Sequence, residues 1–461
     1  MPSWTIKEIT EAVNGKMISA IGDESITGVS FDTRLLEKGD LFIPLTAERN
    51  GHEFIQSAID KGAAAALWSD NLTSAPADFP LIKVTDTEKA FQDFARYYLK
   101  KVGPKVVGVT GSNGKTTTKD MVAAVASARY RTHKTEGNFN NHLGMPHTIL
   151  RMPADTEVLI LEMGMSESGE IHLLSNMAEP DVAIITMIGE SHIEFLGSRE
   201  AISQAKLEIV DGMKGGTLIY PVDEPLLREK VKGGYVQDTV KRILTFGHSE
   251  EADIYAVKTE PEVRHTLFAT NSMPNTECRL PIPGIYNVQN ALSAILAGEV
   301  LGVTQEEAFE QLENFQLTKN RLEWKDGING TTILNDAYNA SPSSMKAVLN
   351  YFQNIDLPGR RIIVLGDVLE LGDQSREMHE SLSEAVHPDK IDLLVLFGQE
   401  MKSLDNKLKP KMAESRLVHF SGEKAELTDF LRTRLKEDDT ILVKSSLSTG
   451  LLEVVSELSL D

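Results

Sequence analysis

Cysteine is almost absent from the sequence. Cys278 is the single cysteine among 461 residues, so no intrachain disulfide can form, and a reducing compartment is the natural interpretation. No apolar run approaches the roughly 20 residues that a membrane-spanning helix needs. The first residues, MPSWTIKEITEAVNGK, carry charges and contain no apolar signal-peptide core. We therefore expect a cytoplasmic protein.

Positive charge is also scarce. Lysine and arginine number 47 against 68 aspartates and glutamates, which gives a formal net charge of −21. This balance argues against a nucleic-acid-binding protein, because duplex binding depends on clustered lysine and arginine that neutralise phosphates. It does not argue against a small anionic substrate, which a few local cations can bind. With 41% apolar and 25% charged residues, the composition is that of a globular protein.

Two charged junctions, KVGPK at 101–105 and LTKNRLEW at 317–324, divide the chain. Between them, VVGVT, EVLILE and DVAIIT are continuous apolar runs typical of strands buried on both faces of a parallel sheet. A β-rich stretch around 241–283 interrupts this pattern. Beyond the second junction, four more strand candidates follow: TTILND, RRIIVLGD, DLLVLFG and DTILVKSS. We predict an α/β protein of three domains, at residues 1–103, 104–317 and 318–461.

The strongest local signal is GVTGSNGKTTTKDM, from Gly108 to Met121. Binding of a nucleotide triphosphate needs backbone N–H groups around the phosphates, a lysine that reaches the β/γ oxygens, and a hydroxyl for Mg²⁺. Glycines let the chain approach the phosphates, and a helix N-terminus favours an anion. Val109 stands where the strict P-loop pattern has its first glycine. An ordinary glycine-rich turn is the alternative, but strand, lysine and threonines in this order favour a phosphate loop.

Three further side chains stand out by their positions, and the first of them could be a Mg²⁺ ligand; each has a simpler alternative. Glu162 ends an apolar run, so it should lie at the carboxyl end of a strand, where open α/β sheets bind ligands; it could equally face solvent. His192 follows the strand DVAIIT, and a histidine there is more often a hydrogen-bonding loop residue. Lys206 falls in one helical stripe with Ile202, Ile209 and Met213. A lysine in an inward stripe usually snorkels to water.

Other candidates have equally plain alternatives. Asn287 and Asn290 lie on one helix face and could read an adenine edge or serve as caps. Arg321, in the second junction, reads as a surface arginine on sequence alone. A second group of polar residues follows a strand near the N-terminus and could bind uracil or diphosphate, or stabilise a turn: Ser30, Asp32, Thr33 and Arg34.

Five segments in order carry a family resemblance: TGSNGKTT, GNFNNHLGMPHTIL (137–150), ITMIGESHIEFLGSREAISQAKLEI (185–209), NDAYNASPSSM (335–345) and LGDVLELG (365–372). Together they resemble the Mur ligases and the related folylpolyglutamate synthetases. The resemblance covers essentially the whole chain and is densest from 106 to 372. Within the Mur ligases it is similar to the branch that joins D-alanyl-D-alanine to UDP-N-acetylmuramoyl-tripeptide through an acyl phosphate.

The resemblance implies a UDP-precursor-binding domain, a central P-loop parallel-sheet ATPase-like domain and a Rossmann-like C-terminal domain for dipeptide and nucleotide. It implies ATP and two Mg²⁺ ions as cofactors, and a carbamoylated Lys206 that bridges the ions. The small-molecule precursor and dipeptide are the expected partners, without nucleic acid or a membrane span. We expect a monomer.

The family's motifs also imply roles for individual residues. Catalytic roles fall to Lys115, His192 and Lys206, and metal ligation to Thr116, Glu162, His192 and Lys206. ATP binding falls to Gly111, Ser112, Asn113, Gly114, Lys115, Thr116, Thr117, Asn290, Arg321 and Asp336. Substrate binding falls to Ser30, Asp32, Thr33, Arg34, Asn138, Asn141 and Asn339.

The chain departs from the family at Ser191, Ser341 and Leu447, where relatives often carry Ala, Asn and Arg. We carry no role to Ser341, and no charge contact is expected at Leu447. The alternatives are another Mur ligase, a folylpolyglutamate synthetase, or a P-loop ATPase that acts as a switch. The DNPR tetrapeptide, which marks the sister enzyme that adds the third residue, is missing, and NDAYNASP occupies its place.

Overall fold

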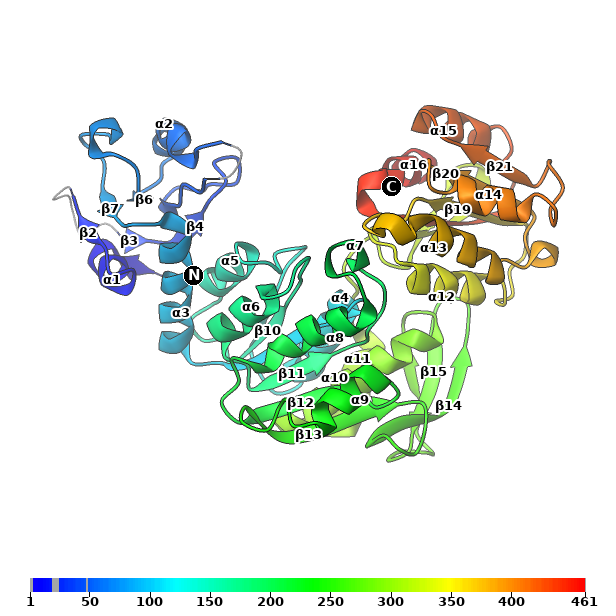
Figure 1. Cartoon of the computed structure of the whole chain (residues 1–461), viewed down its shortest axis with the longest axis horizontal. Helices are drawn as coiled ribbons and strands as arrows, with labels where there is room; N and C mark the ends of the chain where they lie inside the picture. The colour runs from blue at the N-terminus through cyan, green and yellow to red at the C-terminus, as the bar shows by residue number, and fades with distance from the viewer. Residues whose placement is uncertain (1–2, 19–24, 47–48, 461) are drawn as a thin grey trace.

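The computed structural model describes residues 3–18, 25–46 and 49–460. Three α/β units follow one another along the chain, each built on its own main sheet (Figure 1). The N-terminal unit and the C-terminal unit lie on opposite sides above the central unit in Figure 1. This arrangement confirms the predicted fold class. The residue boundaries proposed for the domains stay predictions.

The N-terminal unit pairs short strands in the order β2-β7-β6-β5-β4, with a separate antiparallel pair β1-β3. β4 to β7 run parallel and β2 antiparallel. The strands are β1 (Trp4–Thr5), β2 (Lys16–Met17), β3 (Ser25–Ile26), β4 (Gly28–Ser30), β5 (Asp40–Phe42), β6 (Ala65–Trp68) and β7 (Leu81–Lys83). The helices are α1 (Ile6–Ala12), α2 (Ile55–Asp60), α3 (Thr87–Val102) and the 3-10 turns η1 (Gly51–Phe54) and η2 (Leu72–Ser74).

Helix α3 leads from this unit into the central one. The Asp86 side chain caps its start by accepting the N–H groups of Glu88 and Lys89 at 2.8 and 3.1 Å. Its end is set by Gly103, whose φ of +67° is the left-handed conformation of a helix C-terminus. Only residues 103 and 104 then separate α3 from the first strand of the central sheet.

The central sheet has the strand order β16-β15-β14-β13-β12-β11-β8-β10-β9 among the described residues. β8 to β14 run parallel, and β15 and β16 add an antiparallel edge. The strands are β8 (Lys105–Thr110), β9 (Thr132–Lys134), β10 (Val158–Glu162), β11 (Val182–Ile185), β12 (Gly216–Pro221), β13 (Val240–Gly247), β14 (Ile254–Pro261), β15 (Thr266–Thr270) and β16 (Cys278–Leu280). The helices are α4 (Lys115–Ser127), α5 (Gly144–Arg151), α6 (Glu170–Ala178), α7 (Ile193–Leu196), α8 (Arg199–Leu207), α9 (Pro225–Lys232), α10 (Ile285–Leu301), α11 (Gln305–Asn314) and the turn η3 (Glu208–Val210).

Burial on both faces explains the continuous apolar strands. In β10, Val158 and Ile160 pack into the core beneath α4 and α10, whereas Leu159 and Leu161 pack into the core on the other face. The parallel register sets Val109 of β8 beside Glu162 of β10. The carboxyl ends of β8, β10 and β11 therefore meet at one edge of the sheet.

The C-terminal sheet has the order β17-β18-β22-β19-β20-β21, parallel except for β17. The four strands predicted here are confirmed, and β17 and β21 add one strand at each edge. The strands are β17 (Glu323–Asp326), β18 (Thr332–Asp336), β19 (Arg361–Gly366), β20 (Leu393–Phe397), β21 (Leu417–Phe420) and β22 (Thr440–Lys444). The helices are α12 (Pro342–Phe352), α13 (Ser375–Ser381), α14 (Lys402–Leu408), α15 (Lys424–Arg432), α16 (Leu451–Leu458) and the turns η4 (Ile328–Gly330), η5 (Gly372–Gln374), η6 (Leu382–Glu384), η7 (Pro388–Lys390) and η8 (Leu447–Thr449).

Across the described ranges, none of the helices is both long and apolar enough to cross a bilayer.

Candidate active site

The loop between β8 and α4 depends on two glycines. Gly111 and Gly114 have φ values of +146° and +82°, which disfavour side chains. A Cβ on Gly114 would also lie 2.6 Å from Oδ1 of Asn290. Val109, which broke the strict P-loop pattern, is fully buried inside β8. The loop is therefore shorter than the usual phosphate loop, and the missing glycine falls in a strand that needs an apolar residue.

Lys115 begins α4 and folds back over this loop. Its Nζ donates to the carbonyl oxygens of Gly111 and Ser112 at 2.7 and 3.3 Å. Burial of the ammonium group lowers the pKa of Lys115, the positive charge of Arg321 lowers it further, and Glu162 opposes both. A cation held over a loop at a helix N-terminus is arranged to meet an anion, as the sequence predicted.

Two cavities of about 430 and 310 Å³ open on either side of the loop. We call them the first and the second cavity. Both are lined by Asn113, Gly114, Arg321 and Asn339. Because these four residues belong to both walls, a ligand that extends from one cavity into the other must pass the phosphate loop.

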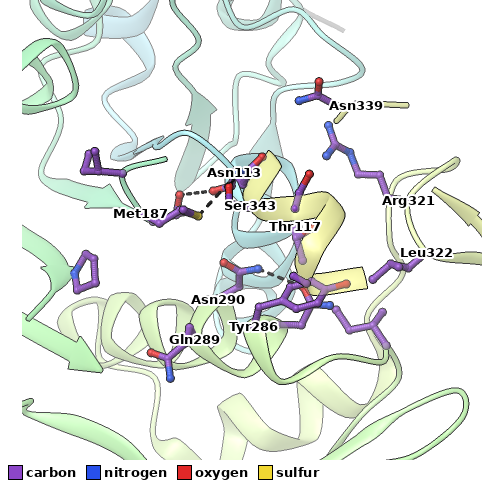
Figure 2. Close-up of a pocket in the computed structure, with 18 of the residues that line it drawn as sticks. Asn113, Thr117, Met187, Tyr286, Gln289, Asn290, Arg321, Leu322, Asn339 and Ser343 are labelled. Atoms are coloured by element: carbon purple, nitrogen blue, oxygen red, sulfur yellow. Dashed lines mark hydrogen bonds between the residues drawn. The ribbon is translucent and has the colours of Figure 1, made fainter. Parts of the chain in front are cut away.

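The first cavity is lined by both polar and apolar residues. Tyr286, Gln289 and Asn290 line it from α10, and Arg321 and Leu322 line it from the linker opposite (Figure 2). Asn290 is buried and donates to Oδ1 of Asn287 at 3.2 Å. Asn287 in turn donates to the carbonyl of Pro283, so neither asparagine caps α10, whose N-cap is Gly284. An aromatic ring and amide groups beside a phosphate loop suit a nucleoside.

The second cavity collects three of the four predicted metal residues and three of the seven predicted substrate residues, and Lys206 does not line it. It is lined by Lys115, Thr116, Asn138, Asn141, Glu162 and His192, among others. Thr117, the alternative hydroxyl, lines the first cavity. Asn141 uses its Oδ1 to accept the N–H groups of Leu143 and Gly144, at 3.2 and 2.8 Å, and so also stabilises the start of α5.

Glu162 lies at the sheet edge, so the alternative of a solvent-facing glutamate is wrong. It is 3% exposed; its Oε1 accepts a hydrogen bond from Asn140 at 2.8 Å. Oε2 is buried and has no protein hydrogen-bond partner. A buried carboxylate oxygen without a donor is costly in isolation. Oε2 of Glu162 is therefore a candidate ligand atom for a metal ion.

Lys206 is fully buried, and its Nζ also has no hydrogen-bond partner. The snorkelling alternative is therefore wrong, because the ammonium group does not reach water. Burial lowers the pKa of Lys206 well below its ordinary value, and the charge of Lys115 acts in the same direction. The predicted stripe is only partly helical: α8 ends at Leu207, and Ile209 and Met213 follow in η3 and the next loop.

His192 lies in the second cavity with a strained backbone, at φ +64°. Its Nδ1 is 2.5 Å from Oε2 of Glu370 in the C-terminal unit. This pairing lowers the pKa of Glu370. The backbone contact from Glu194 N to the Glu370 carbonyl, at 3.3 Å, holds the same two segments together. His192 is thus a paired residue whose other ring nitrogen is available.

No group of three or more His, Cys, Asp or Glu side chains in the described parts of the chain could hold a metal by itself. A metal bound by Glu162 and His192 would therefore need further ligands, such as phosphate oxygens. The orphaned atoms of Glu162 and Lys206 fit such a site.

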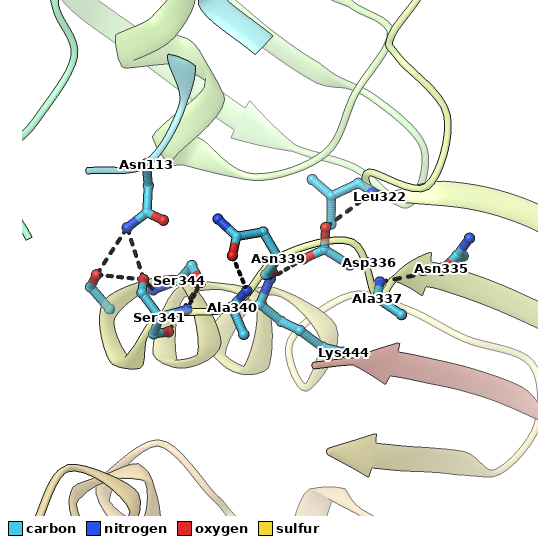
Figure 3. Close-up of polar contacts among 11 residues, drawn as sticks. Asn113, Leu322, Asn335, Asp336, Ala337, Asn339, Ala340, Ser341, Ser344 and Lys444 are labelled. Atoms are coloured by element: carbon cyan, nitrogen blue, oxygen red, sulfur yellow. Dashed lines mark hydrogen bonds and ion pairs between the residues drawn. The ribbon is translucent and has the colours of Figure 1, made fainter. Parts of the chain in front are cut away.

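The C-terminal unit contributes one wall through the end of β18, the loop after it and the start of α12 (Figure 3). Asn113 of the phosphate loop donates to Ser341 at 2.8 Å and to Ser343 at 3.2 Å. Ser341 is the N-cap of α12. Ser341, to which the sequence assigned no role, therefore joins the phosphate loop to the C-terminal unit. Leu447 is 45% exposed in η8 and makes no charge contact.

Asp336 ends β18 and lies at the edge of the first cavity. It accepts from Lys444 Nζ at 2.5 Å and from the backbone N–H of Leu322 at 3.3 Å. Arg321 stacks on Tyr338, with its guanidinium carbon 4.9 Å from the ring centroid, and its buried Nε has no partner. Asp336 and Arg321 thus reach the cavity from the same side, and Arg321 is not the plain surface arginine of the alternative interpretation.

The four predicted residues of the N-terminal unit do not line either cavity. Asp32 and Arg34 bind each other, with Arg34 Nη2 2.7 Å from Asp32 Oδ2. Ser30 Oγ donates to the Asp32 carbonyl at 2.9 Å. The Thr33 carbonyl accepts from Lys61 at 2.7 Å. The loop is therefore a self-stabilised turn, as the simpler alternative stated, and a binding role for it stays a prediction.

Sequence reasoning missed several residues of the site. Lys444 ends a buried strand as Glu162 does, so the strand-end argument could have found it. Asn140 lies in a segment that was singled out, at a position given no role, and Tyr286 directly precedes the singled-out Asn287. Glu370 lies in the singled-out segment LGDVLELG, but only the fold brings it to His192.

Comparisons with known proteins agree with this geometry. The family model described as Mur ligase middle domain matches residues 109–298, and the one described as Mur ligase, glutamate ligase domain matches residues 320–447. The chain therefore belongs to the Mur ligase family, whose members are ATP-dependent amide-bond ligases.

Within the family, the chain is similar to UDP-N-acetylmuramoyl-tripeptide–D-alanyl-D-alanine ligases. It is 43% identical to that of Bacillus subtilis (strain 168), over 98% of each chain. It is 31% identical to that of Escherichia coli (strain K12), over 99% of each. A crystal structure of MurF from Acinetobacter baumannii matches with a TM-score of 0.86 and 28% identity, covering 99% of both chains. MurF ligase from Thermotoga maritima in complex with ADP matches at a TM-score of 0.80 and 26% identity, covering 94% of this chain and 97% of the other.

Proposed function

We propose that this protein ligates D-alanyl-D-alanine to UDP-N-acetylmuramoyl-tripeptide at the expense of ATP, as a step of peptidoglycan precursor synthesis. The observation that carries the proposal is the 43% identity, over 98% of both chains, to the Bacillus subtilis ligase of that name. The geometry agrees with it, since a phosphate loop separates a nucleoside-sized cavity from a polar one. No observation favours a folylpolyglutamate synthetase or an ATPase switch over this reaction.

The chemistry requires two steps, because a carboxylate is a poor electrophile. In the first, a carboxylate oxygen of the tripeptide forms a bond to the γ-phosphorus of ATP, and the bond from that phosphorus to the ADP oxygen breaks. In the second, the amine nitrogen of the dipeptide attacks the acyl carbon of this acyl phosphate. Phosphate leaves with the bonding electrons, the nitrogen loses a proton, and an amide remains.

ATP would place its adenosine in the first cavity beside Asn290 and Asp336, and its phosphates on residues 111–117. Lys115 would move from the loop carbonyls to the β/γ oxygens and stabilise the charge of the transferring group. Arg321 lines both cavities, which supports a contact with the γ-phosphate. Its buried Nε has no protein partner and is free to donate there.

Mg²⁺ would be held by Thr116, Glu162 and His192, with phosphate oxygens completing the shell, since Mg²⁺ prefers oxygen ligands and near-octahedral geometry. When bound, it would neutralise phosphate charge during transfer. Lys206 would join the site as a carbamate. Its buried amine is held neutral more easily than an exposed one, and only the neutral amine attacks CO₂. The unpaired Oε2 of Glu162 supports the same site.

The substrates would approach from different units. Asn138, Asn141 and Asn339 line the second cavity and suit the peptide or muramoyl part of the precursor. Ser30, Asp32, Thr33 and Arg34 are proposed for the uridine diphosphate end, and the C-terminal unit for the dipeptide. Bringing these substrates together supports domain closure before chemistry. We further propose a monomer that works in the cytoplasm, where the single cysteine stays reduced.

A coupled phosphate-release assay with purified enzyme tests the function. UDP-linked di-, tri- and tetrapeptide precursors and a folate are crossed with D-alanyl-D-alanine and with single amino acids, glutamate among them. We expect release of phosphate only with the tripeptide precursor and D-alanyl-D-alanine, and the pentapeptide product by mass spectrometry. Release that needs no acceptor would identify an ATPase, and release with a folate and glutamate would identify the related synthetase.

A further inference from the structure

Beneath the phosphate loop lies a buried charge cluster that the reaction described above does not use. It consists of Lys119, Asp120, Lys134, Thr135 and Thr318. The side chain of Asp120 is fully buried on α4, and that of Lys119 is 1% exposed. Charged groups are seldom buried this deeply without a specific arrangement of partners.

Both oxygens of Asp120 are fully engaged. Oδ1 lies 2.6 Å from Nζ of Lys134 and 3.2 Å from Nζ of Lys119. Oδ2 accepts the backbone N–H of Thr318 at 3.0 Å and its hydroxyl at 2.8 Å. Burial alone would raise the pKa of Asp120, but the two lysines and the hydrogen bonds lower it below its ordinary value. Asp120 is therefore a charged acceptor, which makes the stronger kind of hydrogen bond.

The partners of this carboxylate come from three functional segments. Asp120 itself lies one and a half turns beyond Lys115 on α4. Lys119 donates to the Thr135 carbonyl at 2.8 Å, and the Thr135 hydroxyl accepts the N–H of Glu162 at 3.0 Å. Thr318 belongs to the linker between the central and C-terminal units, three residues before Arg321. The cluster thus connects the helix of Lys115, the strand that ends at Glu162 and the linker that carries Arg321.

The linker is also a wall of the first cavity. Leu317, Arg321 and Leu322 line that cavity, and Thr318 lies between them in sequence. Thr318 is itself half-buried, and it is the residue of this segment whose main chain and side chain both bind α4. The next fixed points of the linker bind the C-terminal unit on both sides of Arg321. Asn335 of β18 donates to Oδ1 of Asn320 at 2.9 Å, and the Leu322 N–H binds Asp336. Arg321 therefore lies between the Thr318 contacts to α4 and the end of β18.

We propose that Asp120 and Thr318 are positioning residues: their hydrogen bonds fix the linker to the phosphate-loop helix and so place Arg321 where the two cavities meet. The inference rests on the proposed contact of Arg321 with the transferred phosphate. Without the Thr318 contacts, the segment 317–321 would lose its hydrogen bonds to α4 and keep the packing of Leu317 against the central core. Arg321 would then follow the C-terminal unit rather than the phosphate loop.

The test compares Thr318→Val with Thr318→Ser in steady-state ligation and in calorimetric binding of ADP. Valine keeps the shape but removes the hydroxyl, whereas serine keeps the hydroxyl. For Thr318→Val we expect about a tenfold rise in KM for ATP and about a tenfold fall in kcat, the scale of losing a hydrogen bond to a charged group. Thr318→Ser should restore both values to within about threefold of wild type. Thermal unfolding should change little, because Thr318 is half-buried in a linker.

A double-mutant cycle with Arg321→Ala identifies the route of the effect. If Thr318 acts through Arg321, Thr318→Val should change kcat by less than about twofold in the Arg321→Ala enzyme, because the two losses are then not additive. The inference would be overturned if Thr318→Val lowered kcat by the full tenfold in the Arg321→Ala enzyme. A wild-type kcat in either single variant, Thr318→Val or Arg321→Ala, would also overturn it. So would a Thr318→Ser enzyme that is as impaired as Thr318→Val. A wild-type enzyme that binds ADP but does not ligate the dipeptide would instead refute the proposed function.

Discussion

Replacing Lys206 by methionine should stabilise the protein and abolish its ligase activity. In the folded protein the Lys206 amine is fully buried, and its Nζ has no hydrogen-bond partner. A buried donor left unpaired costs about 1–3 kcal/mol, and more if it is charged. Methionine has a similar length and volume and no donor. We therefore expect Lys206→Met to raise the free energy of unfolding of the central unit by about 1–3 kcal/mol.

The pH dependence of this difference follows from the lowered pKa of Lys206. Between its folded pKa and the ordinary value of about 10.4, the unfolded chain binds a proton that the folded chain does not. The stability of the wild type should therefore rise with pH in this window relative to Lys206→Met. The advantage of the methionine variant should be greatest in the neutral to acid range and shrink towards pH 10. Lys232→Met, which removes an exposed lysine of α9, should show neither effect.

Carbamate formation on Lys206 should stabilise the wild type relative to Lys206→Met when bicarbonate, Mg²⁺ and a nucleotide are supplied. Bicarbonate with Mg²⁺ and a nucleotide should raise the melting temperature of the wild type but not that of Lys206→Met, by about 2–4 °C for each kcal/mol. A carbamate resonance in the ¹³C NMR spectrum of wild type labelled with bicarbonate, absent from the variant, identifies the group directly. Lys206→Arg should also be inactive, because it keeps the charge but forms no carbamate. A fully active arginine variant, or an active wild type without the resonance, would refute the reasoning.

Three further substitutions test the rest of the site. Lys115→Ala should lower turnover by at least ~100-fold, on the scale of one lost transition-state contact, while calorimetry still detects binding of the UDP-linked precursor; near-normal turnover would contradict the phosphate-loop assignment. Gly114→Ala should weaken ADP binding by about tenfold, since its Cβ would meet Asn290 at 2.6 Å and its φ is +82°; unchanged affinity would mean that the loop relaxes freely. Glu370→Gln should lower kcat by about tenfold and raise the Mg²⁺ requirement, because it releases His192, and an unchanged Mg²⁺ titration would exclude such a role.

The sequence predicted the parts of this protein that depend on local chemistry. Continuous apolar runs such as VLIL and LLVLF became central strands because both of their faces are buried. The strand-end argument placed Glu162 at the ligand edge, and periodicity placed Lys206 inside. Periodicity failed beyond Leu207, where the chain leaves the α-helix yet still buries Ile209. A buried residue outside a helix can mimic helical spacing, so the spacing alone did not set the helix end.

What the sequence could not predict are contacts between distant segments. Glu370 reaches His192 and Ser341 reaches Asn113 only because the C-terminal unit docks on the central one. Both residues lie in segments that carry the family resemblance, but the sequence of neither segment shows which distant side chain it contacts. The Asp32–Arg34 pair is the opposite case. Four polar residues in one loop suggested a ligand, and two of them, Asp32 and Arg34, form an ion pair with each other.

The shared wall of the two cavities restricts where the chemistry can occur. In the proposed reaction the nucleoside occupies the cavity lined by Tyr286 and Asn290, so the carboxylate that receives the phosphate would enter from the cavity lined by Glu162. The γ-phosphate would then be the part of ATP between the two cavities, and Arg321 is a positively charged side chain that lines both. Arg321 comes from neither sheet but from the linker, so its position depends on how the central and C-terminal units are joined. Phosphate transfer should therefore respond to linker geometry as strongly as to any residue of the phosphate loop itself.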